Sequence, residues 1–265
     1  MKITVPGRAS RARLTLALGS TALLPVAALA AAALAAQSQA SSVPKGPTPN
    51  ITVRVEGLTK TLLPPTAVTL TSGSVTKDGK AADSCSGLSA LGALEDATKG
   101  AWAGSWSKSY RQYFISAIEG QAYSSAASYY WSVWVNDKPA QLGACSLYPT
   151  AGSSILFFPD YDGKSKSTAP ANVLGISAPI EVLVGKPFKV LVTSYANATG
   201  KPSPLAGASV SVAGAHASTS SSGAATLTVA SAGIVELHAS APNAVRDETA
   251  VCVHKLGAMC PRVVG

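Results

Sequence analysis

The sequence predicts a mostly β, exported protein, with a first region in which one helix accompanies short strands and a second region that forms a β-sandwich. Charged residues make up 13% of the 265 residues and hydrophobic residues 47%, which is too apolar for a disordered chain. The chain is also too poor in Glu, Lys and Leu for a helical bundle. Gly, Pro, Ser and Thr separate short apolar runs, a pattern that is typical of strands joined by turns.

The first region covers residues 50–160 and begins with two extended segments. Ile51–Gly57 alternates apolar and polar residues with a period of two, which predicts a half-buried strand that ends at the glycine. A second extended segment, Ala67–Thr71, follows a break at Pro64-Pro65. Four further strands are expected at Gly104–Lys108, Tyr113–Ile118, Tyr129–Val135 and Ser154–Phe158. The dipeptide Asn136-Asp137 after the third of these predicts a hairpin turn, because both residues tolerate positive φ.

One helix is expected in the first region. It begins near Ser86 or Gly87, and Leu88, Leu91 and Leu94 recur at helical spacing before Gly100 ends it.

The second region covers residues 176–265, after a polar linker at 161–175, and every apolar run in it is strand-like. Turn residues separate these runs at roughly ten-residue spacing, which predicts a two-sheet sandwich of Greek-key type. The expected strands are Ile180–Val184, Phe188–Ser194, Ser209–Val212, Ala225–Ala230, Ile234–Ser240 and Thr249–His254.

The N-terminus predicts export. Four basic residues precede an uncharged apolar run, Leu14–Ala36, and small residues follow it, as in a secretory signal peptide. We expect cleavage after Ala40, with Ser38 as the alternative position, so that 1–40 is the signal peptide and 41–49 a Pro-rich linker. The alternative is an uncleaved anchor, because the run of 23 residues could span a bilayer. The expected location is therefore secreted or extracellular, with membrane anchoring through residues 1–40 as the alternative.

Charge excludes nucleic acid as an expected partner. Four of the 21 basic residues lie in the first 40, which leaves 17 basic against 13 acidic residues, a net charge of +4. The remaining basic residues are scattered rather than clustered, unlike a nucleic-acid footprint. The N-terminal segment is expected to engage the membrane during export only.

Four cysteines, Cys85, Cys145, Cys252 and Cys260, predict two disulfides in an exported chain. Three connectivities can be drawn. The spacing favours Cys85–Cys145 and Cys252–Cys260, because a Pro/Gly/Ser-rich stretch separates the two pairs. A zinc site is the disfavoured alternative, since there is no C-x-x-C and all three histidines lie in the second region. No metal and no cofactor is expected.

Three stretches of the first region resemble a known family: Ser89–Glu95, Tyr113–Gly120 and Tyr130–Ala140, together with Gly143–Cys145 and Ile155–Asp160. They are similar to the bacterial family of uncharacterised domains related to the C-terminal domain of transcobalamin. The resemblance covers about residues 50–160 and implies a β-grasp-like α+β fold, one helix packed on a mixed sheet. Relatives close this domain over cobalamin held against a helical barrel. This sequence predicts no such barrel, so cobalamin binding is not carried over.

The second region resembles bacterial immunoglobulin-like and carboxypeptidase-regulatory-like modules. The resemblance rests on Pro204–Val210, Thr219–Gly223 and Ala232–Ser240. It implies an immunoglobulin-like β-sandwich and is nearly silent on function.

The best candidate site is the aromatic strand at Tyr129–Val135. Alternation places Tyr129, Trp131 and Val133 on one face, which we interpret as core. The opposite face carries Tyr130, Trp134 and Asn136, and its two rings could form a stacking platform for a sugar, corrin or aromatic ligand. The alternative is that Trp134 packs against the helix or the linker.

Other motifs carry little chemistry. Asp160 and Asp162 precede Gly163 at calcium-loop spacing, but only lysines follow, so a solvated linker is expected. Ser74–Lys77 and Ser105–Lys108 match S-x-x-K without the K-T-G that accompanies it in penicillin-recognising enzymes. We therefore predict no catalytic residues and no enzymatic activity.

Two functions follow as hypotheses. The first is a secreted or cell-envelope binding protein, whose partner is a small molecule (corrinoid or carbohydrate) or an envelope component. The second is a structural or adhesion spacer of the cell envelope without a small-molecule ligand.

Overall fold

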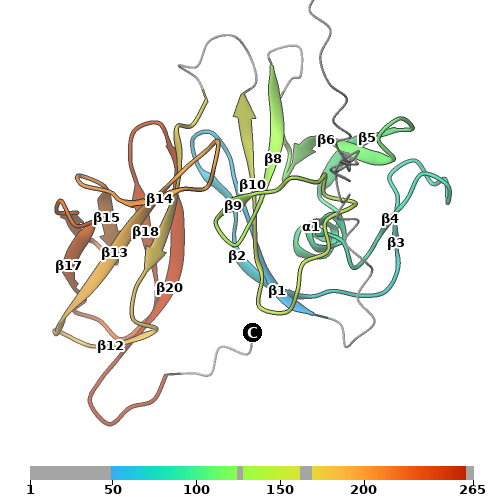
Figure 1. Cartoon of the computed structure of the whole chain (residues 1–265). Helices are drawn as coiled ribbons and strands as arrows, with labels where there is room; N and C mark the ends of the chain where they lie inside the picture. Colours follow the sequence, from blue (N-terminus) through green and yellow to red (C-terminus); the bar gives the residue numbers. More distant parts are fainter. Residues whose placement is uncertain (1–48, 124–127, 162–168, 261–265) are drawn as a thin grey trace, which may run out of the picture. The chain divides into compact units, whose positions relative to one another are not determined.

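A computed structural model describes residues 49–123, 128–161 and 169–260. The predicted signal peptide (1–40), nearly all of the predicted linker at 41–49 and residues 162–168 of the predicted linker at 161–175, including Asp162, lie outside these ranges. The described residues group as one compact unit. Among the described residues, no helix is long and apolar enough to cross a membrane. The described chain is mostly β, with one helix and a mixed sheet followed by a sandwich (Figure 1).

The first part, called here the helix-and-sheet region, is built on a mixed sheet in the order β2-β1-β10-β8-β9. The central strands β1 and β10 are parallel, whereas β2 and β8 flank them antiparallel. The sheet therefore contains both parallel and antiparallel pairs, in agreement with the expected mixed sheet. The bounds are β1 Asn50–Glu56, β2 Thr61–Thr69, β8 Tyr129–Val135, β9 Lys138–Pro139 and β10 Ser154–Tyr161.

Strand β10 has apolar residues on both faces because both faces are covered. Ile155 and Phe157 point into the core beneath the helix, whereas Leu156 and Phe158 belong to a second cluster on the opposite side. A strand buried on both faces loses the alternating pattern, which explains the continuous run Ile155–Phe158.

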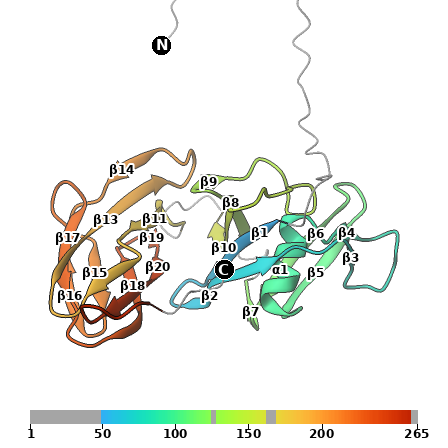
Figure 2. The ribbon, with the colours of Figure 1, turned by 90° about the horizontal axis from the view of Figure 1, so that it is seen from below.

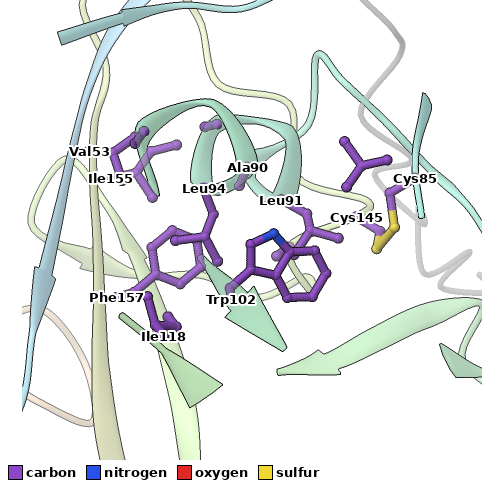
Figure 3. Close-up of a cluster of buried hydrophobic side chains, with 14 of the residues drawn as sticks. Val53, Cys85, Ala90, Leu91, Leu94, Trp102, Ile118, Cys145, Ile155 and Phe157 are labelled. Carbon is purple, nitrogen blue, oxygen red and sulfur yellow. A yellow bond between two sulfur atoms is a disulfide. The ribbon is translucent and has the colours of Figure 1, made fainter. Parts of the chain in front are cut away.

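The helix α1, Ala90–Thr98, packs on this sheet over β1 and β2 (Figure 2). Ser89 caps its N-terminus, with the Oγ accepting from the Gly92 N–H at 3.2 Å. Leu91 and Leu94 are fully buried, and each such side chain stabilises the fold by about 1.5–3 kcal/mol. Figure 3 shows them beside Trp102 and Phe157.

Short strands surround the helix. β3 (Ser74–Val75) pairs with β4 (Cys85–Ser86). A separate sheet has the order β5-β6-β7, with bounds β5 Trp102–Ser107, β6 Gln112–Ile118 and β7 Gln121–Ala122.

The sandwich, residues Asn172–Cys260, has two sheets that enclose a core of Val, Leu and Ala side chains. One sheet has the order β14-β13-β11-β19, with β17 also paired to β13, and the other has the order β12-β20-β18-β15-β16. The bounds of the first sheet are β11 Asn172–Ser177, β13 Pro187–Ala196, β14 Pro202–Pro204, β17 Ala224–Thr228 and β19 Ala244–Val245. Those of the second are β12 Glu181–Leu183, β15 Ser209–Val212, β16 Ala215–Ser218, β18 Gly233–Ser240 and β20 Asp247–His254.

Most predicted strand boundaries differ by one to three residues, and two differences concern a predicted break or linker. β2 runs through Pro64-Pro65 rather than beginning after them, and this is tolerated because β2 lies at the edge of its sheet. β11 begins at Asn172, inside the stretch predicted as linker, so the strands of the sandwich start before residue 176.

Both predicted disulfides are confirmed. Cys85 is bonded to Cys145 and Cys252 to Cys260, which pairs all four cysteines of the chain. The first bond ties β4, just before α1, to the segment after β9 (Figure 3). Disulfides persist in oxidising compartments, so this chemistry fits an extracellular environment.

An apolar cluster joins the helix-and-sheet region to the sandwich. Trp134 and Phe158 from the mixed sheet lie in one cluster with Val173 of β11 and Val245 of β19. The Trp134 and Phe158 rings meet edge-on, with centroids 6.1 Å apart.

A buried charge network joins the same two parts. The Glu56 carboxylate, which is fully buried, accepts from Arg54 Nη1 and from Arg246 Nε, each at 2.9 Å. Arg54 Nη2 also lies 3.0 Å from Asp247 Oδ1, and Arg246 Nη2 donates to the Gly57 carbonyl at 2.6 Å. Burial raises the pKa of Glu56, and the charges of the two arginines oppose this rise. Burial likewise raises the pKa of Asp247 against the opposing charge of Arg54.

Candidate functional site

The site begins with the alternation of β8. Trp131 is buried in the core beneath the helix, and Val133 and Val135 pack against that core, as the alternation predicts. Tyr130, Ser132 and Trp134 point to the opposite face. The two aromatic residues on that face have different environments, because Tyr130 is 45% exposed and Trp134 is 1% exposed.

Trp134 does not form an exposed stacking platform. Its ring lies in the apolar cluster with Phe158 of the mixed sheet and with Val173 and Val245. Val173 belongs to the stretch 161–175 that the sequence predicted as linker, whereas no residue of the helix belongs to this cluster. Although it is buried, Trp134 is among the residues that line the larger cavity described below and a second cavity beside Arg54.

Asn136 has a turn role. Its φ is 50° and its Oδ1 accepts from the Ser154 N–H at 2.9 Å, which closes the β8–β10 edge. The neighbouring Asp137 has a φ of 62°, so the predicted turn chemistry is confirmed. Asn136 lines neither of the two cavities described next, so the structure does not bring it together with Tyr130.

Two adjoining cavities meet at Tyr130. The larger, of about 730 Å³, extends from β8 and the 139–143 segment to the start of the sandwich. The smaller, of about 500 Å³, lies between β6 and β8. Tyr130, Trp131, Val133 and Gly143 line both. We call these two cavities together the aromatic groove.

Exposed apolar side chains border the aromatic groove. Tyr110 is 69% exposed, Phe114 56% and Leu142 36%. The rings of Tyr110 and Phe114 meet edge-on at 5.6 Å. Clustered exposed aromatics of this kind mark interaction sites more often than single exposed side chains do.

The end of the groove at the sandwich is polar. The carboxylate of Asp160, which is buried, accepts from the Tyr130 hydroxyl at 3.1 Å and from Asn197 Nδ2 at 2.9 Å. Asn197 also donates to the Pro170 carbonyl at 3.0 Å. These bonds hold the Tyr130 ring in one orientation, so a ligand that stacks on it would cost little ordering entropy.

Asp160 therefore differs from its prediction. It lies in β10 and anchors Tyr130, rather than belonging to a solvated linker. Sequence reasoning also missed Tyr110, Phe114, Leu142 and Asn197 as groove residues. For Phe114 a signal existed, since it alternates with the buried Tyr113 on a strand. For Asn197 there was none, because it comes from a turn of the sandwich.

One of the two S-x-x-K lysines is engaged elsewhere. Lys77 Nζ lies 2.8 Å from Glu95 Oε2 and 4.5 Å from the centre of the Trp102 ring. These contacts give Lys77 a structural role at the C-terminal end of α1.

The comparisons with known proteins reach only part of the chain. Residues 87–158 match the family described as "Domain of unknown function (DUF4430)". No curated protein matches the chain. A solved protein from Ruminococcus gnavus ATCC 29149, described as a "putative metal binding protein", is 13% identical at a TM-score of 0.31, over 43% of this chain and 99% of that protein. The Arg-specific cysteine proteinase gingipain R (RGPB) is 12% identical at a TM-score of 0.26, over 42% of this chain and 23% of the proteinase.

The family match runs from the turn before α1 into β10, so it includes most of the aromatic groove and stops short of Asp160 and Asn197. Residues 87–158 are thus similar to this domain of unknown function.

Proposed function

We propose that this chain is an exported, non-enzymatic binding protein that holds a carbohydrate of the cell envelope in the aromatic groove. The observation that carries the proposal is the arrangement around Tyr130: an exposed ring fixed by Asp160, between the apolar rings of β6 and a polar end. Sugars present apolar C–H faces and hydroxyl edges. A groove with aromatic walls and a few fixed polar groups complements both.

Export supports the same proposal. The predicted signal peptide at 1–40 and the two disulfides agree with a protein that folds outside the cytoplasm. Fractionation with N-terminal sequencing tests this part. We expect a mature chain that begins near Ser41 in the medium or on the wall, whereas an intact Met1 in the membrane pellet would establish an anchored protein.

Binding is tested with isolated cell-wall polysaccharide and with soluble oligosaccharides derived from it, by sedimentation and titration calorimetry. Phe114→Ala removes an exposed ring without opening the core. If one aromatic contact contributes about 0.5–1.5 kcal/mol, the affinity falls about 2- to 12-fold. Ile180→Ala is the matched control, because Ile180 is 81% exposed and lies in the sandwich away from the groove.

A corrinoid is the alternative small molecule, suggested by the resemblance of the first region to the transcobalamin C-terminal domain. Titration with cyanocobalamin, followed by the corrin absorbance, separates the two. Saturable corrinoid binding that Phe114→Ala weakens, without oligosaccharide binding, would replace the carbohydrate with a corrinoid in the proposal.

The second candidate function is a rigid spacer with an immunoglobulin-like sandwich. It is favoured by the buried network of Arg54, Glu56 and Arg246 and by the apolar cluster around Trp134, which fasten the two parts together. A spacer does not need the groove. Retention of the Phe114→Ala protein on the wall at the wild-type level, without binding to any oligosaccharide, would favour the spacer.

A further inference from the structure

The outer face of the second sheet of the sandwich gathers metal-ligating side chains. On β20, Val251 and Val253 are buried in the sandwich core, so Cys252 and His254 point to the opposite, outer face. The neighbouring β12 runs parallel, with Glu181 opposite Cys252 and Leu183 opposite His254. Its Val182 is in the core, which places Glu181 on the outer face as well.

Cys260 completes this group. The chain turns after β20 and returns, and the disulfide holds Cys260 against Cys252. One ligand atom each from Glu181, His254 and Cys260 all lie within 4.8 Å of one another. His254 Nε2 is 4.0 Å from Glu181 Oε2. The side chain of Glu181 is 57% exposed and that of His254 21%, so solvent ions reach both.

The second nitrogen of His254 is already held. Nδ1 lies 3.1 Å from the Lys255 carbonyl oxygen, where Nδ1–H can donate to it. That tautomer leaves the lone pair on Nε2, the atom beside Glu181 and Cys260. Metal-binding histidines are oriented by this kind of bond from the other ring nitrogen to a backbone carbonyl.

The redox state of the cysteines decides what this group can bind. Thiolates, not disulfide sulfurs, are the strong zinc ligands, so the oxidised chain offers only Glu181 and His254. Reduction by a dithiol transfers two electrons and two protons: the Cys252–Cys260 bond breaks, two thiols form, and the dithiol becomes a disulfide. A zinc ion that binds next displaces the two thiol protons.

We propose that the reduced chain binds one zinc ion through Cys252, Cys260, His254 and Glu181, so that this end of the sandwich exchanges a disulfide for a metal. Four N, O and S ligands are the set that zinc takes in tetrahedral sites. Bond lengths of about 2.0–2.3 Å put tetrahedral ligand atoms about 3.3–3.8 Å apart. The ligand atoms of Glu181, His254 and Cys260, now within 4.8 Å of one another, need to approach by about 1 Å, and the two sulfurs, once reduced, need to move apart to this spacing. Because Cys260 lies in an irregular segment beyond the last strand, this segment can supply the movement.

The zinc ion closes the same loop that the disulfide closes. Reduction alone frees the segment from Cys252 to Cys260, and metal binding ties it again to β12 and β20. The site thus keeps the end of the sandwich fastened in both redox states. It lies on a surface that the aromatic groove does not include, and it does not depend on the proposed binding function.

The test uses the full mature chain reduced with a phosphine, with Co²⁺ as a spectroscopic substitute for zinc. We expect one Co²⁺ per chain, with thiolate-to-cobalt charge-transfer absorption and the visible bands of tetrahedral coordination. Zinc should displace it. His254→Ala and Glu181→Gln should each weaken binding at least about 10-fold, since even outer-shell changes cost zinc sites this much. His216→Ala, an exposed histidine on β16, is the matched control and should bind as the wild type does.

Reduction also converts Cys85 and Cys145 to free thiols, so the reduced Cys252→Ser/Cys260→Ser protein is the second control. It keeps that other pair and should lose the charge-transfer band. Alkylation followed by peptide mass spectrometry gives a readout that does not depend on spectra: zinc should protect Cys252 and Cys260 but not Cys85 and Cys145. Equal alkylation of Cys252 and Cys260 with and without zinc, or unchanged affinity in His254→Ala, would refute the site.

Discussion

Replacing Arg246 with methionine tests the charge network that joins the helix-and-sheet region to the sandwich. Methionine keeps an unbranched side chain but removes the charge and all donors. The change breaks the 2.9 Å pair with Glu56 Oε2 and the 2.6 Å bond to the Gly57 carbonyl. Glu56 is then left fully buried with Arg54 as its remaining charged partner.

The magnitude follows from the burial of the two partners. Breaking a buried ion pair from one side costs about 3–5 kcal/mol, because the other charge stays buried. The Arg246 side chain is 24% exposed, so we take the lower end, about 3 kcal/mol of unfolding free energy. For a folded part of about 200 residues this lowers the unfolding midpoint by about 6–12 °C. Lys189→Met, which removes an exposed cation on β13, is the matched control and should change the unfolding free energy by less than about 0.5 kcal/mol.

The pH dependence gives a second readout of the same change. Burial raises the pKa of Glu56, and Arg246 opposes this rise, so the variant should have a still higher native pKa. A raised carboxyl pKa means that the native state binds more protons than the unfolded state above pH 4.5, so stability falls as pH rises from there towards the native pKa. This fall should be larger in the variant. Urea unfolding between acidic and neutral pH should therefore show a gap from the wild type that widens with pH. A gap that stays constant with pH would contradict the expected change in the pKa of Glu56. A variant as stable as Lys189→Met would mean that the Arg246 contacts do not stabilise the fold.

Three further outcomes are expected. Cys85→Ser/Cys145→Ser should lower the free energy of unfolding in urea by about 4 kcal/mol, and Cys252→Ser/Cys260→Ser by about 2.5 kcal/mol, because the two disulfides close loops with sequence separations of 60 and 8 residues. Equal losses, or a larger loss for the second pair, would contradict the loop-length reasoning. Gly92→Ala should lower the free energy of unfolding by about 1–3 kcal/mol despite the better helix propensity of alanine, because the added Cβ would lie 2.0 Å from the Gly87 carbonyl oxygen. Gly73→Ala is the control, because a Cβ at that position meets open space. A Gly92→Ala protein that is more stable than the wild type would show that the backbone moves to relieve this contact. Tyr130→Phe should weaken ligand binding, because the ring loses the hydrogen bond to Asp160 that fixes its orientation. The unfolding midpoint should change by no more than a few degrees, because the Tyr130 side chain is half-exposed.

Local patterns predicted the elements whose environment is set by their own residues. The strand Tyr129–Val135 has the predicted bounds, and α1 lies inside the predicted helical run. β2 was predicted too short because prolines break central strands but not edge strands, and position in a sheet is not a local property. β11 was missed for a related reason: Asn172–Ser177 follows a polar, turn-rich stretch, and its pairing with β13 and β19 makes it a strand.

The candidate site was predicted in part. Alternation correctly put Tyr130 and Trp134 on one face of β8, but it does not tell which part of that face another element covers. Val173 and Val245 of the sandwich cover the Trp134 end, and they lie 39 and 111 residues away in the sequence. The Tyr130 end stays open, and there the structure adds Asp160 as the group that holds the ring.

The aromatic groove and the contact between the helix-and-sheet region and the sandwich are for this reason one structural unit. Its polar end needs Asp160 from β10 and Asn197 from the turn after β13, and these meet only where the sandwich packs on the mixed sheet. The same packing buries Trp134. Because the match to the domain of unknown function ends at residue 158, the aromatic wall lies within the matched residues while the polar end does not. A related domain that packs against a different neighbouring domain would keep the rings of β6 and β8 but would have different polar groups at the end of its groove. The neighbouring domain would then determine which ligand the groove prefers.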